Sequence, residues 1–307
     1  MKLRRLFLTL AAATVLVATA AEPSDSTACR LSLWPAVTDA GISLALNAGI
    51  TETFKHTVHE WRPDGSDDRS FPSRHASWAF AASSVLSREF YRTTPWVGMG
   101  AHVLASGLGT SRVWKGRHYG GDVAAGAAIG IISAQAGGML SDLIFGRKCH
   151  PSGADAVFAP AIDVESTVLI PLDDNYKSGF ATSVRGVLPF ARHWGVSARA
   201  GILAMARNAA TLKRPSRGGL LTMGFTGHWQ LPARSLAFEA ELQGGVAALT
   251  RYDADSKHWR AAGSVRATLA WQLTTAFAAT ASAGYTATTG TGSISAVAVT
   301  IGSRATF

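Results

Sequence analysis

The chain has 307 residues, of which 47% are hydrophobic and 16% charged. That length suits one or two domains, and the low charge is compatible with a part that enters a membrane. The formal net charge of +9 is spread along the chain and not gathered in a basic cluster, so we expect no nucleic-acid partner.

The N-terminus has the composition of a secretory signal peptide. Lys2, Arg4 and Arg5 precede a short apolar run over residues 6–17, and small residues at 18–20 form a cleavage site. We therefore expect residues 1–20 to be removed on export, with an uncleaved anchor helix as the alternative.

The next part of the chain, residues 21–152, is predicted to be an all-α helical bundle. Its apolar residues recur without strict alternation, and its most apolar stretch, 123–140, is rich in Ala and Gly and so only weakly hydrophobic. We expect a bundle that is compatible with water or with a membrane surface, and a set of true membrane spans is the alternative. The predicted helices are residues 35–59, 73–91, 96–108 and 119–145.

From residue 153 to 307 the hydrophobic period becomes two, which is typical of strands with one apolar face. Strands of about ten residues with one polar face favour an antiparallel eight-stranded β-barrel in an outer membrane, and the final Phe307 suits that class. A soluble sandwich or barrel is the alternative. Six charged residues lie on the polar face, where an eight-stranded barrel has room only for side chains, so we expect a plugged anchor. The eight segments are 157–170, 178–190, 193–206, 218–231, 234–249, 258–271, 274–287 and 293–307, and the charged residues are Arg185, Arg199, Glu239, Glu241, Arg260 and Arg266.

The chain contains two cysteines, Cys29 and Cys149, one at each end of the helical part. An exported protein meets an oxidising compartment in which disulfides persist. We expect these two residues to pair and to close the helical domain, and the alternative is two unpaired thiols.

Three clusters of polar residues in the helical part carry the chemistry. Lys55 and Arg62 lie two helical turns apart on one face. Ser73 is placed to begin a helix, whose free amides bind anions, and His75 follows. The third cluster is Arg112, His118 and Asp122, in which the carboxylate at i+4 can orient the imidazole. Fixed cations, amides and two histidines suit a phosphoryl group, whose charge they stabilise.

In order and spacing these clusters resemble the three motifs of the type 2 phosphatidic acid phosphatase superfamily, which also includes vanadium haloperoxidases and bacterial acid phosphatases. The resemblance covers about residues 40–145 and extends to the linking loop at 62–73. It implies that His118 attacks phosphorus, that Asp122 orients His118, and that His75 protonates the leaving group. It also implies phosphate binding by Lys55, Arg62, Ser73 and Arg112, with no metal and no cofactor.

One residue departs from the family pattern. Arg74 stands where the second motif usually has glycine, between Ser73 and His75. Its side chain would either crowd the phosphate or add a further phosphate-binding cation, so Arg74 bears on rate and on substrate choice more than on the reaction class.

We therefore expect an exported, metal-independent phosphatase that hydrolyses lipid phosphomonoesters or pyrophosphates of the lipid A, isoprenoid-carrier or phospholipid type. The phosphatase domain is expected in the periplasm, because an even-stranded barrel begins and ends on that side. The alternatives are a helical domain that binds phospholipid without catalysis and a vanadate-dependent haloperoxidase. Oligomeric state is left open.

Overall fold

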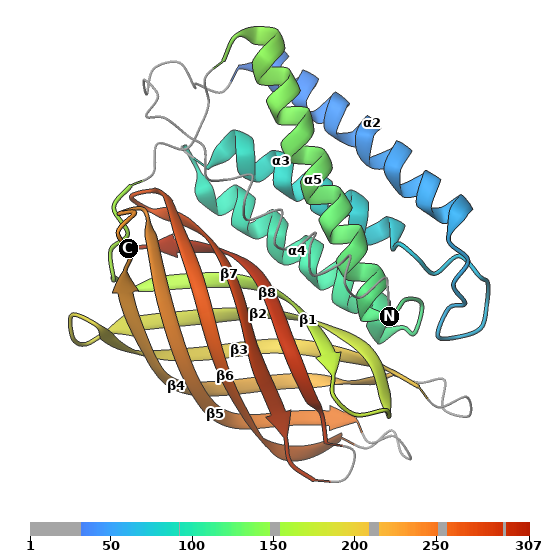
Figure 1. The fold of residues 1–307 in the computed structure, drawn as a ribbon, viewed down its shortest axis with the longest axis vertical. Coiled ribbons are helices and arrows are strands. Elements are labelled where there is room, and N and C mark those ends of the chain that lie inside the picture. Colours follow the sequence, from blue (N-terminus) through green and yellow to red (C-terminus); the bar gives the residue numbers. More distant parts are fainter. Residues whose placement is uncertain (1–31, 92, 148–153, 209–214, 251–256, 291–292) are drawn as a thin grey trace.

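The structure is a computed structural model, and it describes residues 32–91, 93–147, 154–208, 215–250, 257–290 and 293–307. Four helices lie beside a closed barrel of eight strands (Figure 1). The predicted two-part fold, all-α and then antiparallel β, is confirmed. The predicted signal peptide and the predicted pair Cys29 and Cys149 lie outside the described residues.

The helices are α2 (Leu33–Thr57), α3 (Arg74–Phe90), α4 (Pro95–Trp114) and α5 (Gly120–Phe145). Three of them match their predicted ranges closely. Helix α4 continues six residues beyond the predicted end at residue 108, because its last turns lie on the barrel wall. There Gly109 allows close approach, since an added Cβ would lie 2.8 Å from the side chain of Val123 and 3.3 Å from that of Phe180.

The helices pack through small and polar residues. An added Cβ at Gly126 or Gly130 of α5 would lie 2.4 Å from the carbonyl oxygen of Ser73 or Ser77 on α3, so these glycines set the distance between the two helices. Among the described residues, α5 is the one helix that is long and apolar enough to cross a membrane, and half of its most apolar stretch is buried. Helix α2 turns a polar stripe inward, made of Asp39, Ser43, Asn47, Thr51 and Lys55.

Each barrel strand pairs with the next, and β1 pairs with β8, so the barrel has no free edge. Along much of the barrel polar residues point inward and large apolar residues outward, which agrees with the outer-membrane type of barrel and not with the soluble alternative. The strands are β1 (Ala161–Pro171), β2 (Tyr176–Pro189), β3 (Trp194–Arg207), β4 (Ser216–Gln230), β5 (Leu236–Thr250), β6 (Lys257–Thr274), β7 (Phe277–Thr288) and β8 (Ser295–Thr306).

An ion-pair network fills part of the barrel interior. Arg185 donates to Glu241 at 2.7 Å, and Arg304 donates to Asp163 at 2.6 Å and to Glu239 at 2.8 Å. Every buried guanidinium of this network faces a carboxylate, which offsets the cost of desolvation. An apolar cluster that includes Leu203 and Met205 occupies the interior beyond it. The network also contains Glu165, Arg199 and Arg266.

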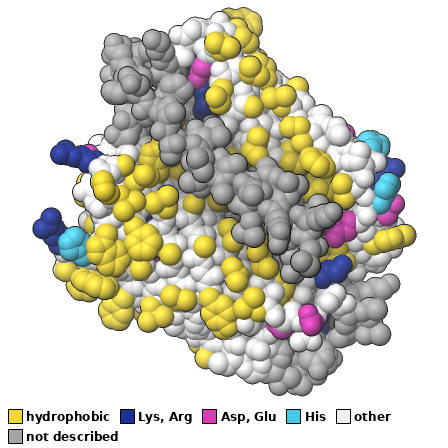
Figure 2. All heavy atoms as spheres, viewed as in Figure 1, with side chains coloured by type: hydrophobic (Ala, Val, Ile, Leu, Met, Phe, Trp, Pro, Cys, Tyr) yellow, Lys and Arg dark blue, Asp and Glu magenta, His cyan; other side chains and the backbone are white. Residues whose placement is uncertain are grey.

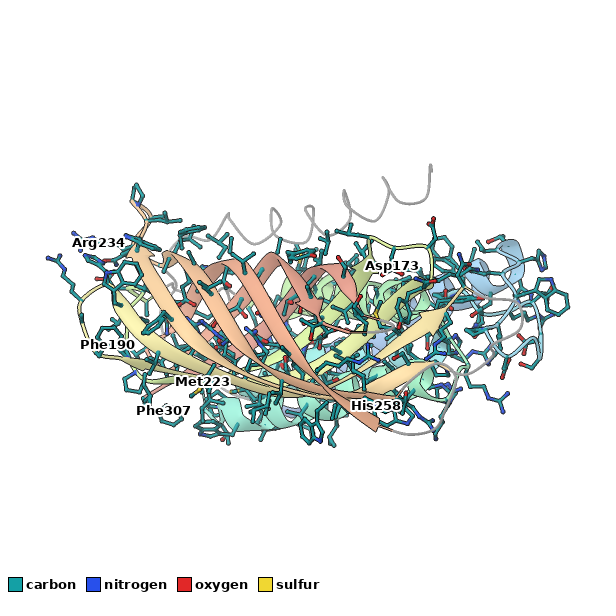
Figure 3. All side chains as sticks on the ribbon, turned by 90° about the horizontal axis from the view of Figure 1, so that it is seen from below. Asp173, Phe190, Met223, Arg234, His258 and Phe307 are labelled. Atoms are coloured by element: carbon teal, nitrogen blue, oxygen red, sulfur yellow. The ribbon has the colours of Figure 1, made fainter. Side chains whose placement is uncertain are left out.

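The two ends of the barrel differ in what they carry. We call the end with Ala161 and Thr306 the terminal end; Phe190, Arg234 and Phe307 lie there in Figure 3. We call the opposite end the loop end; Asp173 and His258 lie there. The loop end carries the connections 172–175, 208–215, 251–256 and 289–294, and the terminal end carries 190–193, 231–235 and 275–276.

The helical domain packs on the outer wall of the barrel, and not above one of its ends (Figure 1). Ser106 and Thr110 of α4 each hydrogen-bond the outward hydroxyl of Thr182 on β2 at 2.7 Å. The outward Phe180 is buried in an apolar cluster with Phe80 and other helical residues. Strands β8, β1, β2 and β3 thus face α4 and α5, whereas the outer faces of β4 to β6 stay exposed.

The interior network predicts a large loss of stability when one carboxylate is removed. Glu239→Ala removes a negatively charged partner from the buried guanidinium groups of Arg185 and Arg304. We therefore expect the free energy of unfolding to fall by about 3–5 kcal/mol. Urea titration of the protein folded in detergent micelles measures this change. Met223→Ala on the exposed outer face is the matched control, and an equal loss in the two variants would contradict the role given to the network.

Candidate active site

The predicted site residues lie at four helix ends on the side of the bundle that is next to the loop end of the barrel. Lys55 lies in the last turn of α2 and Arg112 in the last turn of α4. Ser73 precedes α3 and His75 lies in its first turn, while His118 comes just before α5. Antiparallel packing brings these four helix ends together, which the spacing in the sequence alone does not show.

His118 is held in a single orientation. Only 2% of its side chain is exposed, and Nδ1 lies 2.8 Å from the carbonyl oxygen of Ser70. A carbonyl oxygen can only accept, so Nδ1 carries the proton. The lone pair of the neutral ring is therefore on Nε2, which is the nitrogen left to act as a nucleophile.

Asp122 supports this arrangement mainly through other groups. Its Oδ2 atom accepts hydrogen bonds from the Ser70 hydroxyl and from the Tyr119 amide, the latter at 2.9 Å, and lies 3.7 Å from Nδ1 of His118. Its main-chain oxygen accepts from the Ser73 amide at 3.0 Å. The predicted pair of His118 and Asp122 is therefore close, but the direct partner of Nδ1 is the carbonyl of Ser70.

Several donors near His118 have no partner among the described residues. Ser73 Oγ and Arg112 Nε are both buried without a hydrogen bond. Buried polar groups are nearly always satisfied, so these two donors suit an anionic ligand. Arg62 donates to Asp67 at 2.7 Å through Nε, and Lys55 donates to the carbonyl of Arg69 at 2.9 Å.

The cations of the site repel one another. Burial lowers the pKa of Lys55, and the neighbouring Arg62 and Arg74 lower it further. Burial also lowers the pKa of Arg112, and Arg62 and Arg117 add to that effect. A bound anion would relieve this repulsion, so the electrostatics of the site favour a phosphoryl group.

Both histidines titrate below their usual range. Burial lowers the pKa of His118, against the opposing effect of Asp122. Burial likewise lowers the pKa of His75, and Arg112 and His118 lower it further.

Arg74 is engaged by a carboxylate of α2. Its guanidinium forms a two-point ion pair with Glu52 of α2, with both N–O distances at 2.7 Å, and 52% of its side chain is exposed. Its direct contact with phosphate stays a prediction, and Glu52 competes for the same guanidinium.

Sequence reasoning missed three residues of this region. Ser70 positions both His118 and Asp122. Glu60 lies beside Asp122, and burial with the charge of Asp122 raises its pKa to about 7. Lys177 comes from the barrel, and its Nζ lies 4.3 Å from the centre of the Tyr119 ring. No sequence signal marks Lys177, because it is far from the motifs along the chain. Ser70 lies three residues before Ser73 of the second motif, so its position in the sequence could have suggested it as a site residue.

Comparison with known proteins agrees with the helical half of this arrangement. Residues 36–137 match the PAP2 superfamily model. Over 109 residues, 36% of the chain, the sequence is 38% identical to the lipid A 1-phosphatase of Porphyromonas gingivalis. Over 67 residues, 22% of the chain, it is 43% identical to the bacitracin transport permease protein BcrC of Bacillus licheniformis. The matches span 24% and 31% of those two proteins.

Solved structures similar to the barrel are outer-membrane proteins. Ail of Yersinia pestis matches with a TM-score of 0.33 at 14% identity, covering 48% of this chain and 97% of its own. OprG of Pseudomonas aeruginosa matches with a TM-score of 0.37 at 12% identity, covering 50% and 98%. The chain thus contains a PAP2 superfamily domain at residues 36–137, followed by a closed eight-stranded antiparallel β-barrel.

Proposed function

We propose that the protein is an outer-membrane phosphatase that removes phosphate from phosphorylated lipids through a phosphohistidine at His118. The observation that carries this proposal is the buried His118, whose Nδ1 binds the Ser70 carbonyl at 2.8 Å and whose Nε2 is free. Unpartnered donors at Ser73 and Arg112 provide for the phosphoryl oxygens.

The first step forms a bond from Nε2 of His118 to phosphorus and breaks the bond from phosphorus to the leaving oxygen. Lys55, Arg62 and Arg112 stabilise the charge on the equatorial oxygens. His75 donates its proton to the leaving oxygen, so the lipid departs as an alcohol, or as a phosphate when the substrate is a pyrophosphate.

The second step releases phosphate. The neutral His75 takes a proton from water, the oxygen of that water attacks phosphorus, and the bond from phosphorus to Nε2 breaks. His118 returns to its neutral form with the proton on Nδ1, where the Ser70 carbonyl holds it. The residues supply every proton transfer, so we propose that the reaction needs no metal.

A lipid is the proposed substrate for two reasons. The relative in Porphyromonas gingivalis acts on lipid A by its name, and the barrel exposes large apolar side chains on its outer face, including Leu221, Phe225 and Leu242. Such a belt suits a bilayer and would keep the site next to lipid headgroups. Lipid A, an isoprenoid carrier and a phospholipid all remain in this class.

The sequence predicts that the site lies on the periplasmic side of the outer membrane, and that orientation stays a prediction. It rests on where an even-stranded barrel begins and ends. The site, however, lies at the loop end and not beside Ala161 and Thr306.

Loss of the nucleophile tests the proposal. His118→Ala should lower phosphate release from lipid phosphates by at least about a thousandfold, while the parent stays active in the presence of a chelator. His56→Ala, on the exposed face of α2, is the matched control and should keep parental activity. Equal release by the parent and His118→Ala would mean a different nucleophile. No release by the parent would favour a binding domain, and halide oxidation with added vanadate would favour a haloperoxidase.

The lowered pKa values of both histidines predict an acidic optimum. His118 must be neutral to attack, so kcat/KM rises with pH through its pKa. His75 must carry a proton, so kcat/KM falls as pH rises through the pKa of His75. Burial lowers both pKa values, so the maximum should lie on the acid side of about pH 6.5.

A pH series of kcat/KM with one lipid phosphate measures this profile. His75→Ala should lose the descending limb, because the acid that titrates there is absent. A maximum well above neutral pH, or an unchanged descending limb in His75→Ala, would contradict the roles of the two histidines.

A further inference from the structure

We infer that the helical bundle lies in the same bilayer as the barrel strands, against their outer wall, and that the active site faces the surface at the loop end. Its substrates are then phosphorylated lipids of the leaflet on that side. The part that concerns substrates rests on the proposed function, whereas the placement of the helices rests on the contacts and the composition described below.

Each helix has a long stretch without Asp, Glu, Lys or Arg. These stretches are residues 40–51, 76–87, 95–111 and 123–141. The charged residues of the helices fall outside them, near one end or the other. The hydrocarbon layer of a bilayer, about 30 Å thick, excludes charge. At about 1.5 Å per residue, the stretches in α4 and α5 approach that thickness, whereas the shorter stretches in α2 and α3 cover little more than half of it. Helix α4, with 20 residues at about 1.5 Å each, has that length.

The bundle has its polar residues inside and its large apolar residues outside. Helix α2 buries Ser43, Asn47 and Thr51, and Ser77 of α3 hydrogen-bonds both Asn47 and Thr51. Polar residues that face the interior and pair there are typical of helices in membranes. The outward surface carries exposed large apolar side chains, among them Leu86, Trp78, Leu104, Leu108, Met139 and Leu140.

Helix α4 extends along the barrel wall from one end to the other. At the terminal end, the ring of Trp96 lies 5.5 Å from that of Phe307. At the loop end, the guanidinium of Arg217 lies 5.6 Å from the ring of Trp114 and donates to its carbonyl oxygen. The helix therefore occupies the same layer as the strands, on a wall that would otherwise face lipid.

The site itself lies at the loop end. The amide of Gly121 donates to Ser178 Oγ of β2 at 3.1 Å, and Lys177 lies over the Tyr119 ring. Both barrel residues directly follow the β1–β2 connection. His118 immediately precedes Tyr119, so the proposed nucleophile is level with this rim of the barrel.

The surface of the molecule has a band pattern in agreement with this placement. On the face shown in Figure 2, hydrophobic side chains spread over helices and barrel alike, and most of the charged and histidine side chains in view lie toward the left and right edges. Exposed aromatic residues mark both edges of the barrel wall: Trp194, Trp229 and Phe238 near the terminal end, and Trp259 and Tyr285 near the loop end. Aromatic girdles at both interfaces are a property of membrane barrels.

The connection lengths indicate which side each end faces. Three of the connections at the loop end, 208–215, 251–256 and 289–294, have more residues than any connection at the terminal end. The shortest connection of the barrel, 275–276, is at the terminal end. Outer-membrane barrels have short periplasmic turns and longer extracellular loops. The loop end, and the active site with it, would face the cell exterior and the outer leaflet, opposite to the periplasmic side predicted from the strand count.

Cysteine labelling tests this placement without relying on activity. Single variants His59→Cys beside the site, Asp174→Cys at the loop end, Arg234→Cys at the terminal end and Leu104→Cys on the outer face of α4 all replace exposed side chains. A membrane-impermeant maleimide is added to intact cells, to cells with a permeabilised outer membrane, and to detergent-solubilised protein. Peptide mass spectrometry then reports each position separately from Cys29 and Cys149.

We expect labelling of His59→Cys and Asp174→Cys in intact cells, of Arg234→Cys only after permeabilisation, and of Leu104→Cys only in detergent. Heat-modifiable migration on gels confirms that each variant is folded. Three outcomes would overturn the inference: His59→Cys labelled only together with Arg234→Cys, Arg234→Cys labelled in intact cells while Asp174→Cys is protected, or Leu104→Cys labelled in the membrane. The pattern should be the same in a His118→Ala background, so an inactive protein would refute the proposed function and leave this test intact.

Discussion

Asp122 joins two segments that are distant along the chain, the loop before α3 and the start of α5. Its carboxylate accepts the Tyr119 amide at the start of α5 and the Ser70 hydroxyl from the loop before α3, while the main-chain oxygen of the same residue accepts the Ser73 amide. Through Ser70 this arrangement fixes the ring of His118. The nucleophile, the start of α3 and the start of α5 therefore depend on one buried residue, and the close packing at Gly126 and Gly130 keeps the two helices near enough for its contacts.

A second constraint is the wall that the helices and the barrel share. Gly120 lies so close to β2 that an added Cβ would be 2.2 Å from the carbonyl oxygen of Gly179. This contact sets the beginning of α5 against the barrel rim, and the ion-pair network holds the barrel rigid from within. The barrel thus has two roles in this account: it anchors the chain, and it determines the level in the membrane at which the site meets its substrate.

Much of this fold could be predicted from the sequence, for identifiable reasons. The alternation around Trp229 and Trp271 reports the two faces of the strands, so all eight strands were located to within a few residues. The three motifs predicted the candidate site residues because each motif is local: His118 and Asp122 are four residues apart, and Ser73 and His75 are two apart. The helix ranges were good except for α4, whose last turns are stabilised by contacts with Phe180 and Thr182.

What the sequence could not reveal depends on contacts between distant segments. Lys177 reaches Tyr119 only because the bundle lies on the barrel wall, and Glu60 approaches Asp122 only once the loop before α3 has folded. The direction in which Arg74 points is decided by Glu52 on a neighbouring helix. The periplasmic expectation rests on the strand count alone, which locates the ends of β1 and β8 but does not show that the helix ends with the candidate site lie at the opposite end of the barrel.

The central claim is that phosphate passes through a covalent bond to His118. Rapid acid-free quenching of the purified protein with a ³²P-labelled lipid phosphate, followed by peptide mapping, measures this intermediate directly. The account predicts a label that is stable in base, labile in acid and located on the peptide that contains His118, and that is absent in His118→Ala. Label on another residue, or steady phosphate release from that variant, would contradict it.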